Sequence, residues 1–231
     1  MFTPTKRKCL LLLTFLLVAG AVACFVMPKR QPVYQGKQLE AWLDDLVAKQ
    51  DDPKAIAAVR AIGTNAIPYL LESIAAPYDE RKSRFYYGLN LLLHKKLNLA
   101  KKQIFYPDDI RFHRAVDGFR ALGSSASNAA PQLGLLLDNR MRGGGVVEAL
   151  VCIGPNSLPV LVEALTNRSH VVRYNALLGL HDFGPQAKSA FKLVEGFLND
   201  TNQVFGLPNS VFAARALKSM EASDVPTTGK P

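Results

Sequence analysis

Apolar residues recur in four segments of the chain at fixed distances before a glycine. In residues 171–184, which read VVRYNALLGLHDFG, apolar side chains stand eight, seven, four and one residues before Gly184. The same offsets precede Gly63, Gly123 and Gly154. The sixteen apolar positions are Ala55, Ile56, Val59, Ile62, Ala115, Val116, Phe119, Leu122, Val146, Val147, Leu150, Ile153, Ala176, Leu177, Leu180 and Phe183. This spacing places them on one face of an α-helix, and glycine favours the left-handed turn that ends a helix. The pattern predicts four helices, each ending at a glycine.

A second apolar segment follows each of these glycines. The segments are NAIPYLLESI from Asn65, SNAAPQLGLLLDN from Ser127, NSLPVLVEAL from Asn156 and AKSAFKLVEGFLND from Ala187. Each unit is therefore a helical hairpin with a period near 30 residues. The closing glycines are 60, 31 and 30 residues apart, so we expect one degenerate repeat in residues 77–109. Repeats of this kind predict an all-α, right-handed α-solenoid of about ten or eleven helices in roughly five hairpins, with no sheet.

The repeats resemble the HEAT-like family, in the short bacterial form typified by repeats of phycobilisome lyases. The resemblance covers about residues 54–200. It is clearest in VVRYNALLGLHDFG and in the two G-x4-P turns, Gly63 to Pro68 and Gly154 to Pro159. It implies an α-solenoid. Members of the family include scaffolds, chromophore lyases and nucleic-acid binders that share no catalytic motif, so it implies no activity and no site residue.

The ends of the repeat domain, which we place at residues 31–222, have their own apolar patterns. Residues 34–49 predict a capping helix that places Leu39, Trp42, Leu43 and Leu46 on one face. A last helix begins at Asn209 and is expected to pack through Val211, Phe212, Ala214 and Leu217. Residues 223–231 show no apolar periodicity and are predicted to be a disordered tail.

The first thirty residues predict a membrane segment. Lys6, Arg7 and Lys8 precede an uncharged run from Cys9 to Met27. Nineteen helical residues can just span a hydrocarbon core about 30 Å thick. We favour an uncleaved, single-pass signal anchor with the domain on the non-cytoplasmic side. Two alternatives stay open. Residues 20–24 resemble a bacterial lipobox, in which Cys24 would be lipidated, and the run also fits a cleaved signal peptide of a secreted protein.

Composition adds little to this picture. The formal net charge is +9, but residues 1–30 hold five basic and no acidic residues, which leaves +4 for the rest. That is an ordinary surface charge, so the basic balance does not by itself indicate nucleic acid.

Residues 78–114 depart most from the repeat, because basic and aromatic residues alternate there without repeat register. One interpretation is a structural insertion, with an amphipathic helix at residues 88–97 and an exposed loop near Pro107. Exposed aromatic side chains often anchor a protein partner, and the candidates are Tyr86, Tyr87, Phe105 and Tyr106. The segment could also bind an anionic surface, such as lipid headgroups, an acidic polymer or nucleic acid. The candidate anion-binding residues are Arg81, Lys82, Arg84, Lys95, Lys96, Lys101 and Lys102.

No motif indicates catalysis, a cofactor or a metal. The four histidines lack metal-ligand spacing. Cys152 stands where other repeats have Ala61, Ala121 and Asp182, so we interpret it as a small residue on a helix flank. The triple glycine at residues 143–145 lacks the Lys-Ser or Lys-Thr of a phosphate-binding loop, and we expect a flexible turn.

The leading hypothesis is a non-catalytic, membrane-tethered scaffold that binds a protein along the face formed by the second helices. A binder of anionic surfaces is the alternative, with nucleic acid as the least favoured of its ligands. A lyase-like enzyme is the second alternative and ranks lower, because no nucleophile with a positioned base is visible.

Overall fold

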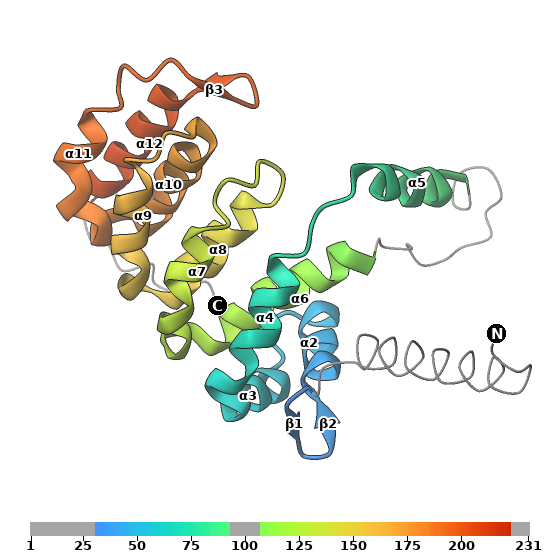
Figure 1. Ribbon diagram of the computed structural model, residues 1–231. Helices are drawn as coiled ribbons and strands as arrows, with labels where there is room; N and C mark the ends of the chain where they lie inside the picture. Colours follow the sequence, from blue (N-terminus) through green and yellow to red (C-terminus); the bar gives the residue numbers. More distant parts are fainter. Residues whose placement is uncertain (1–30, 93–106, 223–231) are drawn as a thin grey trace, which may run out of the picture. The chain divides into compact units, whose positions relative to one another are not determined.

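The computed structural model describes residues 31–92 and 107–222, and these are mostly helical (Figure 1). The chain divides into two units, Met1–Gln31 and Pro32–Pro231, and all the elements named below belong to the second. Its α-helices are α2 (Leu39–Ala48), α3 (Pro53–Ile62), α4 (Ile67–Ile74), α5 (Glu80–Leu91), α6 (Pro107–Leu122), α7 (Ala130–Gly134), α8 (Gly143–Ile153), α9 (Leu158–Ala164), α10 (His170–Phe183), α11 (Phe191–Glu195) and α12 (Asn209–Glu221). Four two-residue strands form two hairpins: β1 (Val33–Tyr34) with β2 (Lys37–Gln38), and β3 (Gln203–Val204) with β4 (Leu207–Pro208).

The four helices expected to end at a glycine are confirmed as α3, α6, α8 and α10. Fifteen of the sixteen apolar repeat positions are buried, and Ile56 is half-buried. The closing residues Gly63, Gly123, Gly154 and Gly184 have φ of 61°, 55°, 90° and 54°. At Gly154 the ψ of −161° is extended rather than left-handed helical. Almost no residue but glycine adopts a positive φ with an extended ψ. This position of the repeat therefore requires glycine more strictly than a position with left-handed helical φ and ψ would.

The second helices are shorter than the sequence suggested. A 3₁₀ turn begins at or directly after each closing glycine. It takes in the first residues of the expected second helices, such as 127–129 within Gly123–Ala129 and 187–190 within Gly184–Ala190. As a result α7, α9 and α11 have only 5, 7 and 5 residues. Within the described ranges, only about eight helices are longer than these three short ones. The expectation of ten or eleven was therefore too high.

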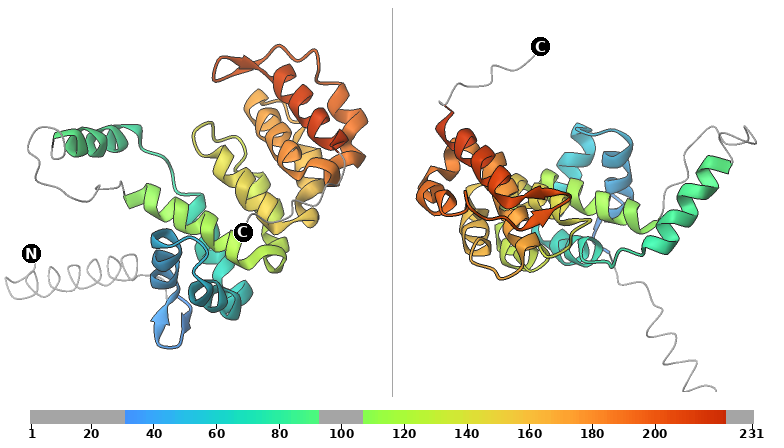
Figure 2. Two further views of the ribbon diagram at one scale, coloured as in Figure 1. Left: turned by 180° about the vertical axis from the view of Figure 1, so that it is seen from behind. Right: turned by 90° about the horizontal axis from the view of Figure 1, so that it is seen from above.

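The helices pack in chain order around one continuous apolar core. Helix α6 contacts α2, α3 and α4 on one side and α8 on the other, α8 contacts α10, and α10 contacts α12 (Figure 2). Gly118 of α6 allows the approach to α4, because a Cβ there would lie 2.5 Å from Leu70 Cδ2. Since α4 packs directly on α6, the described residues of the intervening segment form no repeat between them. The expectation of a degenerate packed repeat in residues 77–109 was wrong.

Helix α5 is instead a helix with no buried residue. It begins at an N-cap, where the Asp79 carboxylate accepts hydrogen bonds from the backbone N–H groups of Arg81 and Lys82 at 3.0 and 3.1 Å. Helix α5 therefore begins eight residues before the helix expected at residues 88–97, of which residues 93–97 lie outside the described residues. Local capping and helix propensity, rather than tertiary packing, account for this helix.

The triple glycine is the first turn of α8, not a flexible loop. A Cβ at Gly143 would lie 2.2 Å from Asn175 Nδ2, and one at Gly145 would lie 2.6 Å from the Phe112 ring. Gly143 and Gly145 are needed because α8 approaches its neighbours closely at these two positions, whereas a Cβ at Gly144 would have no heavy atom within 4 Å. Asn175 is itself buried and donates from Nδ2 to the Leu137 carbonyl at 2.7 Å.

The prediction that the domain has no sheet was wrong at both of its ends. A β-hairpin precedes α2 and another precedes α12, each with two turn residues of positive φ: Gln35 (50°) and Gly36 (75°), then Phe205 (53°) and Gly206 (82°). Positive φ at both central positions is the geometry that two-residue hairpins favour. The strands are too short for their sequences to show an alternation of apolar and polar residues.

The two terminal helices differ in how well their packing was predicted. In α2, Leu39, Leu43 and Leu46 are buried, and Trp42 is half-buried with its Nε1 donating to the Tyr34 carbonyl at 3.2 Å. In α12 the expected face was right in part: Phe212 is buried and Leu217 packs half-buried against the core, but Ala214 is exposed and Val211 is only half-buried. The buried residues are Asn209, Phe212, Ala213, Ala216 and Met220. This face packs mainly against α10 and α11.

Candidate functional site

A groove of about 490 Å³ lies between the second helices α7 and α9. Pro131, Gly134 and Leu135 line one side, and Pro159, Val160 and Glu163 line the other. The floor is narrow because a Cβ at Gly134 would meet Val160 Cγ1 at 2.5 Å. Leu135 is 83 % exposed, the most exposed large apolar residue among those described. The groove is thus an open apolar surface on the second helices.

Leu135 was not singled out from the sequence, although a signal was present. It belongs to three consecutive leucines, and consecutive positions on a helix point about 100° apart. All three cannot face one core. Leu137 is fully buried, Leu136 is half-buried and Leu135 points outward. An apolar run that is wider than one helix face therefore indicates that one of its residues is exposed.

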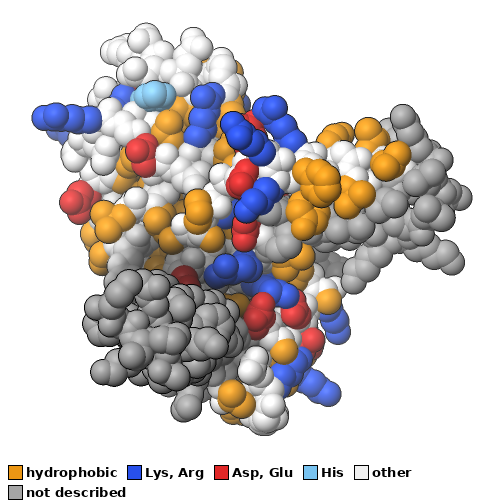
Figure 3. Space-filling view, turned by 45° about the vertical axis from the view of Figure 1, so that its right-hand side comes forward, with side chains coloured by type: hydrophobic (Ala, Val, Ile, Leu, Met, Phe, Trp, Pro, Cys, Tyr) orange, Lys and Arg blue, Asp and Glu red, His pale blue; other side chains and the backbone are white. Residues whose placement is uncertain are grey.

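The first helices carry ion pairs that join neighbouring layers. The guanidinium of Arg114 on α6 binds Glu40 and Asp44 on α2, with Nε 2.7 Å from Asp44 Oδ1. The guanidinium of Arg120, also on α6, binds Asp117 on its own helix and Glu148 on α8. Charged side chains of both signs are intermixed on the face shown in Figure 3. These arginines are engaged with carboxylates of the same chain.

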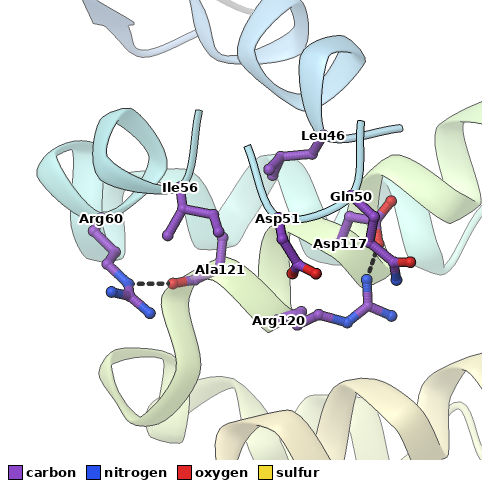
Figure 4. A pocket seen from close by; sticks show the side chains of 8 residues that line it. All are labelled: Leu46, Gln50, Asp51, Ile56, Arg60, Asp117, Arg120 and Ala121. Atoms are coloured by element: carbon purple, nitrogen blue, oxygen red, sulfur yellow. Dashed lines mark hydrogen bonds and ion pairs between the residues drawn. The ribbon is translucent and has the colours of Figure 1, made fainter. Parts of the chain in front are cut away.

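A small pocket of about 150 Å³ lies beside this network (Figure 4). Arg60 lies at one end and donates from Nε to the Ala121 carbonyl at 2.9 Å, while Asp117 and Arg120 pair at the other. Burial raises the pKa of Asp117 although Arg120 opposes the shift. Burial also raises the pKa of the nearby Cys152 thiol, which disfavours the reactive thiolate. Asp117 and Arg120 thus bind each other, and Arg60 is engaged with a backbone carbonyl.

The residues predicted to bind a partner or an anion lie in the insertion, and the structure describes only some of them. Tyr87 is 72 % exposed on α5, and Tyr86 is half-buried with its ring edge against Phe85 at 5.8 Å between centroids. Phe85, which is not among the predicted partner-binding residues, is itself 65 % exposed. Arg81, Lys82 and Arg84 occupy the first turns of α5. Phe105, Tyr106, Lys95, Lys96, Lys101 and Lys102 lie outside the described residues, as does Cys24.

Two of the basic residues on α5 already pair with acids. Lys82 Nζ lies 3.7 Å from Asp79 Oδ2, and Arg84 Nη2 lies 2.5 Å from Glu80 Oε1. Both pairs are exposed, so they contribute little to stability and can be exchanged for other anions. Lys82 and Arg84 therefore remain candidate anion ligands.

The two ends of the insertion meet at a single buried arginine. Arg142, 5 % exposed, donates to the Ala76 carbonyl at 2.8 Å and to Asp109 Oδ1 at 3.0 Å. Its guanidinium also lies over the rings of Tyr78 and Phe112, at 5.3 and 4.9 Å from their centroids. Ala76 and Tyr78 precede α5, whereas Asp109 and Phe112 lie in α6. No sequence signal pointed to Arg142, because its partners lie 33 and 66 residues away.

No protein family, curated protein or solved structure matches the chain. Within the described ranges, no group of three or more histidine, cysteine or acidic side chains is arranged to hold a metal ion. In the same ranges no helix has both the length and the apolar character needed to cross a membrane; the predicted membrane segment, residues 1–30, lies outside them.

Proposed function

We propose that this chain is a non-catalytic, membrane-tethered scaffold of HEAT-like helical hairpins that binds a protein partner along its second helices. Support for the repeat architecture comes from the four glycine-terminated helices and from their packing in chain order. Support for the tether comes from the uncharged run of residues 9–27 with basic residues on both sides.

The groove between α7 and α9 carries the proposal. An exposed leucine beside two prolines and a valine presents apolar surface that a partner side chain could cover, and polar residues such as Gln132 and Asn167 also line the groove. Burying one leucine side chain contributes about 1.5 to 3 kcal/mol. A pocket with an apolar centre and a polar rim is typical of the part of an interface that contributes most to binding.

The proposal is tested by placing a charge in the groove. Leu135→Glu in the full-length chain should abolish co-purification of the partner from native membranes, because a carboxylate would be desolvated in the interface. Leu207→Glu on β4 is the control, since Leu207 is also exposed, at 41 %, but lies away from the groove. Neither variant should change the melting temperature. Equal retention of the partner by both variants would refute the proposal.

A further inference from the structure

Helix α5 exposes apolar side chains that the rest of the described chain does not cover. None of its residues is buried, and Phe85, Tyr87, Leu91 and the following Leu92 are 65 %, 72 %, 41 % and 43 % exposed. Short exposed helices in water usually carry polar residues on every face, because apolar contact with water is unfavourable. The surface of α5 therefore suits contact with something other than water.

The two sides of α5 differ in the way their charges are used. Phe85, Leu89 and Leu92 follow one another at helical spacing, and Arg81 and Lys82 lie one turn before Phe85 on the same side. We refer to these five residues as the Phe85 face. The other side carries Tyr87 and Leu91, which follow the Glu80–Arg84 ion pair. In that pair the charged atoms lie 2.5 Å apart, whereas Lys82 Nζ lies 3.7 Å from the carboxylate of Asp79. Basic charge that is only loosely paired thus accompanies the apolar residues of the Phe85 face.

Basic residues are concentrated in the sequence of this helix and of the residues that follow it. Residues 81–107 contain seven lysines and arginines and no acidic residue. Residues 1–30 contribute +5 and residues 81–107 contribute +7 to the total of +9, so the remaining residues carry 9 − 5 − 7 = −3. The segment that exposes apolar side chains is therefore also the basic segment of a domain that is otherwise acidic.

We propose that the Phe85 face of α5 lies on the surface of an anionic lipid bilayer. Aromatic and leucine side chains would enter the boundary between headgroups and acyl chains, and Arg81 and Lys82 would bind lipid phosphates. This is the chemistry of helices that lie in the membrane interface. The inference goes beyond the proposed scaffold function, and it uses a surface separate from the groove at Leu135.

The inference is tested by photo-crosslinking from α5 in the full-length chain. Benzoylphenylalanine replaces Phe85 in one sample and Tyr87 in another, and each protein is reconstituted into vesicles of phosphatidylcholine with or without phosphatidylglycerol. We expect lipid adducts from position 85, several-fold fewer from position 87, and a loss of the position 85 adduct when phosphatidylglycerol is omitted. Equal adduct yields at the two positions, or equal yields in both vesicle types, would overturn the inference.

Charge variants provide a second measurement. Removing Arg81 and Lys82 as R81Q and K82Q should lower the position 85 adduct by about fivefold for each charge, whereas R84Q on the other side should change it little. High salt should act as the double variant does, because it shortens the screening length. An adduct to protein rather than to lipid in native membranes would assign the Phe85 face to a protein partner and overturn the bilayer proposal. Because none of these samples alters Leu135, failure here is distinguishable from failure of the groove.

Discussion

At the scale of single residues, Arg142 shows how one buried charge can organise a repeat boundary. It satisfies the Ala76 carbonyl and the Asp109 carboxylate at once and packs against two aromatic rings. A buried guanidinium is tolerated only when hydrogen bonds compensate for its lost hydration. Arg142 thus holds the start of α6 and the end of the first repeat together where the insertion interrupts the chain.

Arg142→Ala should lower the free energy of unfolding by about 2 to 4 kcal/mol, because it leaves both partners without a donor. Arg142→Lys should lower it by less, since an ammonium keeps the charge but cannot reproduce the planar two-partner geometry. Urea unfolding measures both. Arg168→Ala is the control, because Arg168 is exposed and little change is expected. A similar loss in the control would show that the effect is not specific to the buried site.

Asp200 is the second residue whose environment makes a measurable prediction. Burial opposes ionisation of its carboxyl group, but hydrogen bonds from Asn202, Asn209 and Arg173 outweigh this effect and lower its pKa from 3.8 to about 2. These bonds fix the loop between α11 and β3, with Asn202 Nδ2 at 2.6 Å and Arg173 Nε at 3.0 Å.

Because the folded-state pKa lies below the unfolded value, Asp200 stabilises the fold fully above about pH 4, and this contribution is lost as pH falls towards about 2. Asp200→Asn should be less stable than the wild type at neutral pH, and its stability should fall less between about pH 5 and about pH 3. Urea unfolding at the two pH values provides the comparison. Parallel losses in the two proteins would contradict the low pKa.

At the scale of elements, the closing glycines set where each first helix ends. At Gly154 a Cβ would have no heavy atom within 4 Å, so any cost of substitution comes from the backbone alone. A Cβ at Gly144, within α8, would also have no heavy atom within 4 Å, but Gly144 does not have a positive φ. Comparing alanine substitutions at Gly154 and Gly144 therefore measures the effect of backbone strain without a steric contact of the added Cβ.

Gly154→Ala should destabilise the protein by about 1 to 3 kcal/mol, because alanine is strained at a φ of 90° with an extended ψ. Gly144→Ala should instead stabilise it slightly, by up to about 1 kcal/mol, because alanine favours the helix. Thermal melting of the two variants distinguishes these signs. If both variants were equally stable, the glycine would not be required by the turn.

The sequence predicts the first helices well because each buries one face, and burial imposes a regular spacing on residues such as Leu177 and Leu180. It predicts other features poorly where the cause is not periodic. The packed repeat expected in residues 77–109 rested on counting periods, yet α4 already fills the position beside α6. The 3₁₀ turns begin at or after glycines of positive φ, and the two-residue strands are joined by residues of positive φ; neither feature imposes an apolar period.

The candidate sites also include features that the sequence predicts and features that it does not. The exposure of Tyr87 agrees with its lack of repeat register. The groove depends on Leu135 and Val160, which come from two different hairpins and meet only after packing. Arg142 likewise acquires its role from partners distant in sequence. A single repeat pattern contains no information on such contacts.

At the scale of the whole repeat unit, the insertion is an addition to a stack that is already continuous. Its two ends meet at one guanidinium, so a short connection can replace what lies between them. Replacing residues 80–105 by a short Gly-Ser linker should change the free energy of unfolding by less than about 1 kcal/mol, since loop closure depends only weakly on length. Urea unfolding of this variant should remain cooperative. Loss of cooperative unfolding would mean that the insertion belongs to the core.

The proposed scaffold function is tested most directly by crosslinking from the groove itself. Benzoylphenylalanine at position 135 of the full-length chain, irradiated in native membranes, should give one dominant protein adduct that mass spectrometry can identify. The same group at position 207, on the exposed β4 strand, should not give this adduct. If position 135 gives no protein adduct, or the same adducts as position 207, the second-helix groove is not where this protein binds a partner.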